Sequence, residues 1–423
     1  MINRNLLDAY KIEHGNIKVA IAGAGYISKG LIQQITLLDF IDVVSIYSKT
    51  RAPIIALLKD ANLPLSIIAD TIEDFCDSDA DIVVELTGDT EFGCGLALAT
   101  LAANKHFVVS AETDALVGPV LAELFREKDL IYSNMWGDEP GLIKHLYNYA
   151  DVLGFGIVAV GKFKGFHDSF ANPDSVLPWA EKSGQKPTMI ASFADGSKMS
   201  MEMTIVSNAT GLVADVPGMH LAKGTLEDIV GLLKLKKDGG ILNQTGVIEV
   251  VCGVEPSGGV FAVITTDKPE ILDSLSYYKM GDGPNYLLYL PYHMPGIEAL
   301  YGLYVNVVEH QSVVRPLGAP VSDVITRAKR DLKKGDKLDC IGGYDYYGEM
   351  TSAEHSVNDH ALPLGLATGA ILLADINKGE PILFHHVEIQ GHKDGCQLRQ
   401  RFSDMVLEKQ RLESAHIKRV SLG

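Results

Sequence analysis

The sequence contains few cysteines, and they form no pattern. Among 423 residues there are five, all far apart in the chain: Cys76, Cys94, Cys252, Cys340 and Cys396. No two have the short spacing of a structural zinc site or a redox pair, and a disulfide framework needs more cysteines in a smaller domain. We therefore expect reduced thiols, which is the usual state of cysteines in the cytosol.

A long apolar run is also absent. No stretch reaches the roughly 20 apolar residues that a membrane-spanning helix needs. The amino-terminal stretch MINRNLLDAYKIEHGN has no apolar core of the kind found in signal peptides. We therefore expect a cytoplasmic protein with no membrane partner.

Positive charge is scarce. Lys and Arg number 37 against 54 Asp and Glu, so the formal net charge is −17. This argues against nucleic acid as a partner, because binding to a phosphate backbone needs a positive surface. A small anionic substrate would need its own local group of cations. The chain length and the 47% hydrophobic content predict a soluble globular protein of two or three domains.

The stretch KVAIAGAGYISKGLIQQI, residues 18–35, organises the first part of the chain. An apolar run predicts a strand, Gly23 and Gly25 predict a tight turn, and apolar residues from Ile27 onward recur at helical spacing. Such a turn presents the unpaired N–H groups of the helix to a pyrophosphate. Ser28 stands where the dinucleotide fingerprint has its third glycine, and serine is small enough for close packing there. An ordinary glycine turn is the alternative.

Residues 41–47, IDVVSIY, predict the second strand, and the carboxyl end of this strand distinguishes NAD from NADP in such folds. NAD needs an Asp or Glu there to bind the ribose diol. This chain instead has Ser48, Lys49, Thr50 and Arg51. Two hydroxyls and two cations suit a ribose phosphate, so we predict NADP. The alternative is a basic loop that faces water.

Strands and helices continue to alternate as far as Asn134, which predicts a doubly wound parallel sheet of the Rossmann type. Ligands of such a sheet bind beyond the carboxyl ends of its strands. Three of these ends carry polar side chains, namely Glu85 with Thr87, Ser110 with Glu112, and Asn134. We expect Thr87 and Asp138 to cap helices, which leaves Glu112 as the stronger candidate for chemistry.

The pattern changes near Gly154, and the segment that follows supplies most of the candidate catalytic residues. In the strand GKFK, Lys162 and Lys164 occupy alternate positions, so both ammonium groups project to one side and would attract an anion. Further polar residues are interleaved with small and apolar ones, namely Asp195, Lys198, Glu202, Asn208 and Asp215. The alternating Met199, Met201 and Met203 predict one face of a packed strand or helix.

Residues 286–308 alternate and then become helical, as expected of a segment that returns to pack on the first domain. From about Arg315 the pattern changes to short strands that are broken by Lys-Gly turns, with Asp331–Asp336 echoed by Asp375–Glu380. We expect a compact all-β unit there. The sequence of the tail, LRQRFSDMVLEKQR and the residues after it, predicts a helix.

Several short motifs then occur in a familiar order: GAGYISKG, VVELTG, GDEPG, GKFK, SNATGL with GMH, YHMPGIE, AKRDLKKGD and LPLGLATG. With them the chain resembles, up to about residue 390, the predicted homoserine dehydrogenase-like NAD(P)-dependent oxidoreductases that end in a SAF domain. That family includes a deoxyxylulose-phosphate reductoisomerase-like enzyme. The resemblance implies an α/β fold in three parts: a Rossmann domain, an α+β catalytic and dimerisation domain, and an all-β SAF domain of the β-clip type.

Together, the residue patterns and the resemblance predict an NADP-binding domain at 1–153, a substrate-binding and catalytic domain at 154–314, a SAF-like domain at 315–392 and a tail at 393–423. The resemblance implies reductoisomerase-like hydride transfer between NADP and a small, polar, phosphorylated hydroxy-ketone, in isoprenoid precursor synthesis, by a homodimer or homotetramer. Homoserine dehydrogenase and sugar-acid dehydrogenase are the alternative activities. A nucleotide- or carbohydrate-sensing binding protein is the alternative of another class.

The candidate site residues fall into four sets. The cofactor-binding set is Gly23, Gly25, Tyr26, Ile27, Ser48, Lys49, Arg51, Thr87 and Gly88. The catalytic set is Lys162, Lys164, Lys198, Glu112 and Glu202, and the substrate-binding set is Asn208, Asp215, His220 and His293. A divalent metal, Mg²⁺ or Mn²⁺, would be held by the hard carboxylate oxygens of Glu112 and Glu202. The alternatives are lysines that pair with Asp195 and Glu202 at the surface, glutamates bonded to lysines or backbone, and structural histidines.

Overall fold

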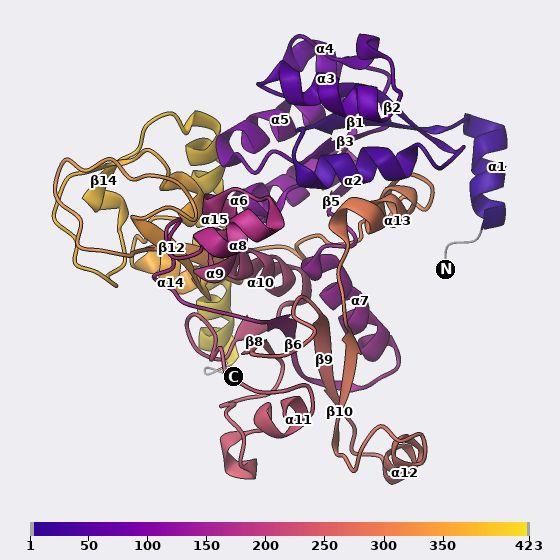
Figure 1. Ribbon diagram of the computed structural model, residues 1–423. Coiled ribbons are helices and arrows are strands. Elements are labelled where there is room, and N and C mark those ends of the chain that lie inside the picture. Colours follow the sequence, from indigo (N-terminus) through magenta and orange to yellow (C-terminus); the bar gives the residue numbers. More distant parts are fainter. Residues whose placement is uncertain (1–3, 421–423) are drawn as a thin grey trace. The chain divides into compact units, whose positions relative to one another are not determined.

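The chain forms two compact units, each assembled from separate stretches of sequence. The computed structural model in Figure 1 describes residues 4–420, with side chains as far as Ala415. One unit contains the chain up to Gly141 together with Met294–Gly318 and Lys393–Leu398. The other contains Leu142–His293, Ala319–His392 and the chain from Arg399 onward. The predicted boundaries after residues 153, 314 and 392 divide the chain consecutively, whereas both units are discontinuous in sequence.

The first unit is built on a five-stranded parallel sheet with the strand order β2-β1-β3-β4-β5. Its strands are β1 (Ile17–Ala22), β2 (Ile41–Tyr47), β3 (Ile82–Glu85), β4 (His106–Val109) and β5 (Tyr132–Asn134). Its helices are α1 (Arg4–His14), α2 (Tyr26–Ile35), α3 (Arg51–Asp60), α4 (Ile72–Cys76), α5 (Thr90–Ala102), α6 (Ala111–Glu127) and α13 (Pro295–Val307), with a 3₁₀ turn η1 (Leu65–Ile67). This is the predicted Rossmann architecture, drawn mainly in indigo and purple in Figure 1.

Helix α13 joins this unit although it follows the second sheet in sequence. Ala299 and Leu303 of α13 belong to the same buried cluster as Leu31 of α2. The two helices approach closely at paired glycines, since a Cβ on Gly30 would lie 3.4 Å from the Cα of Gly296. The expectation that this segment returns to pack on the first domain is confirmed.

The second unit is built on a mixed sheet with the order β10-β9-β6-β8-β7, of which β6, β8, β9 and β10 are labelled in Figure 1. Its strands are β6 (Gly156–Lys164), β7 (Val213–Ala214), β8 (Val247–Cys252), β9 (Val260–Thr265) and β10 (Asn285–Leu290). The accompanying helices are α7 (Glu139–Val152), which begins in the first unit, α8 (Leu177–Ser183), α9 (Pro187–Ala194), α10 (Ser197–Thr210), α11 (Ile229–Leu232), η2 (Lys236–Asp238) and α12 (Pro269–Tyr277). One apolar core lies on this sheet, where Phe163 and Phe261 stack with ring centroids 5.2 Å apart.

Helix α10 is buried on all sides, with Lys198 as its only half-buried residue. Met199, Met201 and Met203 are packed inside this helix, as predicted, but they do not form a single face of it, because α10 is buried all round and residues two apart point to different sides of a helix. Its polar side chains bond to the later part of the same unit. The hydroxyl oxygens of Ser207 and Ser322 lie 2.6 Å apart, and the Ser200 hydroxyl donates to the carbonyl of Gly348 at 3.0 Å.

Residues 319–392 contain two antiparallel strand pairs, β11 (Ser322–Ala328) with β12 (Tyr346–Ser352), and β13 (Ile371–Leu372) with β14 (Val387–Glu388). They also contain a helix, α14 (Ala353–Asn358), and two 3₁₀ turns, η3 (Leu364–Leu366) and η4 (Phe384–His386). The segment is thus mainly short strands and turns but not entirely β. Ser352 caps α14 by accepting the N–H of His355, a local signal that strand periodicity does not reveal.

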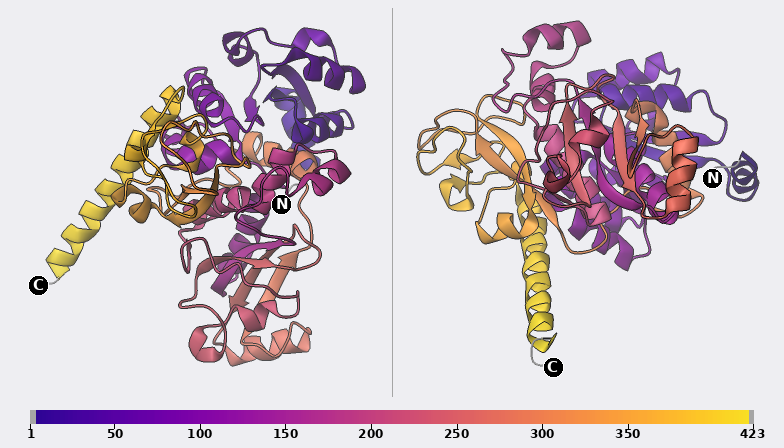
Figure 2. Two further views of the ribbon diagram at one scale, coloured as in Figure 1. Left: turned by 60° about the vertical axis from the view of Figure 1, so that its left-hand side comes forward. Right: turned by 90° about the horizontal axis from the view of Figure 1, so that it is seen from below.

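The two echoed Lys-Gly turns of this segment bind each other. Lys333 forms an ion pair with Asp375 at 2.8 Å, and the backbone N–H of Lys378 donates to Asp331 at 2.8 Å. The chain ends in α15 (Lys393–Val420), the predicted tail helix, drawn in yellow in Figure 2. Among the described residues, no helix combines the length and apolar character needed to cross a membrane.

Candidate functional site

The glycine turn between β1 and α2 has the geometry of a pyrophosphate site. Gly23 has a positive φ of 113°, and a Cβ there would lie 2.7 Å from the carbonyl oxygen of Leu86. Only glycine fits such a position without backbone movement. Gly25 is the N-cap of α2, is exposed, and would place a Cβ in open space. The first amide groups of α2 therefore face a space that an anion can enter.

The rest of the turn agrees with this arrangement. Ser28, at the position of the third glycine, is fully buried, so the small side chain permits the predicted close packing. Tyr26 is exposed and Ile27 is half-buried on the first turn of α2. These residues fit a dinucleotide, and binding by Gly23, Gly25, Tyr26 and Ile27 stays a prediction.

The cations at the end of β2 lie at the surface of the same unit. Lys49 forms an ion pair with Asp89 at 2.7 Å, and Arg51 forms one with Asp70. The four side chains are all more than two-fifths exposed, so these pairs are solvated and weak. Both cations can therefore exchange their carboxylate partner for a phosphate at small cost.

The carboxyl ends of β3 and β4 are joined by a buried carboxylate. Glu85 accepts the backbone N–H of Thr87 at 2.7 Å and that of Ser110 at 3.2 Å. The expectation that Thr87 caps a helix is wrong, because Asp89 caps α5 by accepting the N–H of Phe92 at 3.0 Å. The Thr87 hydroxyl bonds to Glu85 instead.

Glu112 lies at the same edge of the parallel sheet. It stands in the first turn of α6 and is half-buried. Gly88 has a positive φ of 68°, and a Cβ on it would lie 3.6 Å from the Cδ atom of Glu112. The structure thus places Gly88 and Glu112 beside each other beyond the strand ends, which is where ligands of such sheets bind.

The second unit brings together two predicted catalytic residues that lie 40 positions apart. The ammonium of Lys162, on β6, donates to Oε2 of Glu202, on α10, at 2.6 Å. The Lys162 side chain is 9% exposed and that of Glu202 is 4% exposed. The alternative of a surface pair is therefore wrong for this lysine, since both charges are removed from water and held by each other.

Lys164 and Lys198 lie near the junction of α9 and α10. The Lys164 ammonium donates to the carbonyl of Phe193, and Lys198 stands in the first turn of α10. Both side chains are half-buried. His167, three residues after Lys164, lies at the same junction, because a Cβ on Gly196 would be 2.9 Å from its ring. Burial, and then the charge of Lys164, lower the pKa of His167, so its imidazole is neutral near pH 7.

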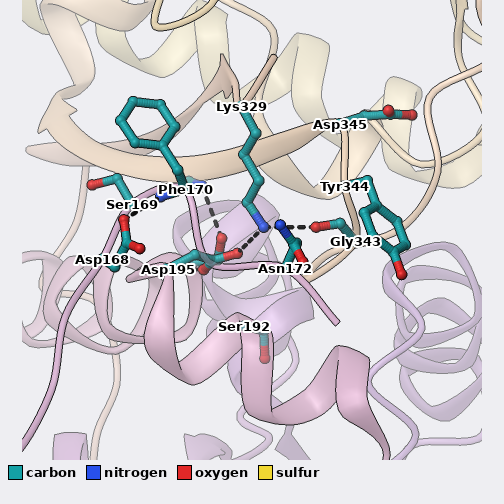
Figure 3. Close-up of polar contacts among 12 residues, drawn as sticks. Asp168, Ser169, Phe170, Asn172, Ser192, Asp195, Lys329, Gly343, Tyr344 and Asp345 are labelled. Carbon is teal, nitrogen blue, oxygen red and sulfur yellow. Dashed lines mark hydrogen bonds and ion pairs between the residues drawn. The ribbon is translucent and has the colours of Figure 1, made fainter. Parts of the chain in front are cut away.

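A second buried ion pair lies at this junction (Figure 3). Lys329, directly after β11, contacts Asp195 at 2.7 Å and donates to the carbonyl of Gly343 at 2.8 Å. Asp195 also accepts the N–H of Ser197 at 2.7 Å, just before α10. Burial raises the pKa of Asp195, and the charge of Lys329 opposes that rise.

Sequence reasoning missed Lys329 and His167 as site residues. A signal for Lys329 exists, since it is the first of two cations that follow an apolar strand directly. Its partner Asp195 lies 134 positions away, and no local pattern connects them. His167 falls in a polar stretch without periodicity, so only its position next to Gly196 distinguishes it.

The predicted substrate-binding residues occupy three separate positions in the second unit. The Asn208 amide holds β11 by accepting the N–H of Val321 at 2.9 Å and donating to the carbonyl of Ser322 at 3.2 Å. The Nδ1 atom of His293 lies 2.6 Å from the carbonyl oxygen of Gly258, to which it donates. These contacts position backbone, and substrate binding by Asn208 and His293 stays a prediction.

Asp215 and His220 lie together, and a third residue joins them. His220 Nδ1 is 2.6 Å from Oε1 of Glu249, a residue of β8 that sequence reasoning also missed. His220 Nε2 is 3.6 Å from Oδ2 of Asp215. Burial raises the pKa of Glu249, and the hydrogen bonds that Glu249 accepts from His220 oppose this rise. The signal for Glu249 was a lone acid within the apolar run VIEVVC.

The predicted metal ligands lie in different units, Glu112 in the first and Glu202 in the second. Oε2 of Glu202 already accepts the Lys162 ammonium, so a cation bound there would compete with Lys162. The site at Glu112 and Glu202 stays a prediction.

Comparison with known families identifies one region. Residues 137–299 match the model described as "Oxidoreductase DRL, catalytic domain". This region contains β6, α10 and β8, and with them the Lys162–Glu202 pair. No curated protein matches the chain.

Solved structures with a similar arrangement are oxidoreductases of low sequence identity. Scyllo-inositol dehydrogenase from Lactobacillus casei, with NAD(H) and scyllo-inositol bound, is 14% identical over 70% of this chain and 91% of that chain, with a TM-score of 0.42. A dehydrogenase (MviM) from Clostridium difficile is 13% identical over 71% and 93%, with a TM-score of 0.42. Biliverdin reductase from Synechocystis sp. PCC 6803 is 17% identical, but the match covers 37% of this chain and about half, 49%, of the reductase, with a TM-score of 0.28. At these scores the likeness supports no argument about substrate.

The family match and the first unit together establish the class of the protein. Residues 137–299 match an oxidoreductase catalytic domain. The first unit is a Rossmann sheet with an open glycine turn at the N-terminus of α2. The protein is an NAD(P)-dependent oxidoreductase, and the prediction of an enzyme is confirmed.

Proposed function

We propose that the protein is an NADPH-dependent oxidoreductase that acts on a small, polar, phosphorylated hydroxy-ketone, with a rearrangement coupled to reduction as in the reductoisomerase-like enzymes. The observation that carries this proposal is the buried Lys162–Glu202 pair inside the region that matches the DRL catalytic domain. Catalytic groups that are held by each other and shielded from water can act on a carbonyl with little reorganisation.

The first unit supports NADPH as the reductant. When bound, the nicotinamide supplies the hydride for the reduction. Gly23 and Gly25 leave room for the pyrophosphate at the start of α2, and Ser48, Lys49 and Arg51 follow β2 where the adenosine ribose would lie. The absence of an acidic residue directly after β2 favours the ribose phosphate.

Lys162 is the proposed proton donor to the reacting oxygen. As a carbonyl carbon gains a hydride, its oxygen gains negative charge and then a proton. The Lys162 ammonium can stabilise that charge and give the proton, after which Glu202 holds the neutral amine in place. In the opposite direction the neutral amine takes the proton from a hydroxyl.

The substrate anion is proposed to lie near Lys164 and Lys198. Both are half-buried at the α9–α10 junction, where Lys164 bonds to the carbonyl of Phe193. Lys198 stands in the first turn of α10, where the helix dipole also favours negative charge. The neutral imidazole of His167 at this junction can accept or donate a hydrogen bond to a substrate hydroxyl.

A sugar-acid dehydrogenase is the second candidate, and the same Lys162–Glu202 pair favours it, because lysine next to a carboxylate can take a proton from a secondary hydroxyl. The predicted Mg²⁺ or Mn²⁺ at Glu112 and Glu202 is a separate proposal. It predicts that chelation lowers turnover of the native enzyme and that Mg²⁺ or Mn²⁺ restores it, and undiminished turnover in chelator would remove it.

The experiment is a substrate panel with NADPH or NADP as the reporter. Purified protein is mixed with phosphorylated hydroxy-ketones, and loss of NADPH absorbance is recorded. Homoserine and sugar acids are tested with NADP in the oxidative direction. Turnover of a phosphorylated hydroxy-ketone supports the first proposal, and turnover restricted to sugar acids replaces it with the second. Nucleotide binding without turnover of any compound would favour a sensing protein over both.

A further inference from the structure

A cluster of one histidine and two acids lies on β8 and on the loop that follows β7, outside the proposed catalytic residues. One ligand atom from each of Asp215, His220 and Glu249 lies within 4.8 Å of the others. The Asp215 side chain is fully buried, that of Glu249 is 1% exposed, and that of His220 is 17% exposed. The cluster is thus buried, with one edge at His220 open to solvent.

The cluster contains two carboxylates but only one group, the imidazole of His220, that could carry a positive charge. Neither carboxylate has an ion pair with lysine or arginine within the described part of the chain. The Lys236 ammonium donates to the side-chain carbonyl of Asn243 at 2.7 Å, and no ion pair joins it to either carboxylate among the described residues. A protonated imidazole would balance only one of the two carboxylates. An unbalanced buried charge is costly, so a bound cation would stabilise the cluster.

One oxygen of the cluster has no partner. Oδ2 of Asp215 accepts the N–H of Asn243 at 2.8 Å and its amide nitrogen at 3.0 Å. Oδ1 of Asp215 is buried and makes no hydrogen bond with any described residue. Buried carboxylate oxygens are nearly always bonded to protein, water or an ion. The orphaned oxygen therefore indicates a ligand.

The orientation of His220 is the one seen for metal-bound histidines. Its Nδ1 atom donates to Oε1 of Glu249 at 2.6 Å, and its backbone N–H donates to Oε2 at 3.0 Å. This fixes the ring and directs Nε2 toward Asp215, as carboxylate partners do for metal-bound imidazoles. The 3.6 Å between Nε2 and Oδ2 of Asp215 is long for a hydrogen bond. It suits an ion that lies about 2 Å from each ligand.

We propose that Asp215 and His220 Nε2 bind a divalent transition-metal ion, Zn²⁺ or Mn²⁺, and that Glu249 positions the imidazole. One nitrogen and carboxylate oxygens favour such ions over Mg²⁺, which prefers oxygen ligands alone. The ion would join the two ends of the loop from Asp215 to His220, which Glu249 already holds to β8 through His220. Water completes the coordination at the exposed edge of His220.

This site is separate from the proposed catalytic pair. Glu249 is paired in register with Gly161, whereas Lys162 is paired with Val250. Neighbouring residues of a strand point to opposite faces of the sheet. Glu249 and Lys162 therefore lie on opposite faces, and the metal site does not depend on the proposed function.

The test uses the untagged full-length protein, which is stripped with chelator, incubated with Zn²⁺, Mn²⁺ or Mg²⁺ alone, dialysed and measured for bound metal by elemental analysis. The native protein should retain Zn²⁺ or Mn²⁺ in near-equimolar amount and gain thermal stability with it. Asp215→Asn and His220→Gln should abolish this retention. Glu249→Gln should weaken affinity by about 10–100-fold, the usual loss for a partner of a metal-bound histidine.

Asp273→Asn, an exposed acid on α12, is the matched control and should bind metal as the native protein does. Circular dichroism shows whether each variant is folded. His220→Gln changes the residue with the most exposed side chain of the cluster, so it remains informative if the buried variants unfold. The proposal is overturned if the native protein retains no Zn²⁺ or Mn²⁺, or if a folded His220→Gln or Asp215→Asn variant retains as much as the native protein.

Discussion

Replacement of Lys162 by methionine tests the buried pair most directly. Methionine keeps much of the length of the lysine stem but removes the ammonium. The Glu202 carboxylate then stays 4% exposed with its lysine partner gone. We expect two separate effects, a loss of stability in the second unit and a loss of turnover.

The expected loss of stability follows from the geometry. Two unit charges 2.6 Å apart attract by about 6 kcal/mol at an effective dielectric constant of about 20. Loss of hydration offsets much of this attraction, so the intact pair contributes little net stability. Removal of one partner is different, because the other charge stays buried, and the expected cost is about 3–5 kcal/mol.

A double variant separates stability from catalysis. Lys162→Met with Glu202→Leu removes both charges, so most of the lost free energy of unfolding should return. Turnover should stay about 10²–10⁴-fold below that of the native enzyme, the range expected for loss of a general acid. Lys333→Met is the matched control, since its ion pair with Asp375 is 71% and 59% exposed and should contribute at most about 1 kcal/mol.

The assays are urea unfolding followed by circular dichroism, and NADPH consumption with the substrate found in the panel. The reasoning about the buried pair fails if Lys162→Met costs no more stability than Lys333→Met. The assignment of Lys162 as proton donor fails if the double variant is folded and turns over at the native rate.

Three further predictions concern other parts of the chain. Arg51→Ala should narrow the preference for NADPH over NADH by about 1–3 kcal/mol, measured by titration of both nucleotides, and equal affinities in the native protein would refute the choice of NADPH. Burial raises the pKa of Asp114 from 3.8 to about 6. The folded protein therefore binds the proton of the Asp114 carboxyl more tightly than the unfolded chain does. The stability that this protonation contributes is complete below about pH 4 and is lost as the pH rises to 6. The free energy of unfolding should therefore fall by about 3 kcal/mol between about pH 4 and pH 6, and Asp114→Asn should remove this fall. Urea unfolding of both proteins at several pH values tests this, and a variant with the same pH dependence as the native protein would refute the prediction. Truncation after Val314 removes the partners of Asn208 and Asp195, so the fragment should be insoluble or unfolded; a soluble, fully active fragment would show that residues 315–392 are an independent accessory.

Local sequence determined much of the first unit. Strands β1 and β2 occupy the residues that the apolar patterns predict, and α2 begins directly after the glycine turn. These features depend on periodicity, on glycine and on short-range packing, which neighbouring residues specify. Lys162 and Lys164 were likewise placed at the end of a strand, because residue alternation alone decides which side chains share a face.

The sequence by itself thus determined the Rossmann sheet, the position of the glycine turn and the residues that could carry chemistry. Only the tertiary structure decided which of them meet. Lys162 pairs with Glu202, Asp195 with Lys329, and His220 with Glu249. Each pair joins elements that are distant in sequence. Whether a pair raises or lowers the stability of the fold depends on how deeply it is buried, and burial results from tertiary packing, which no local pattern of residues specifies.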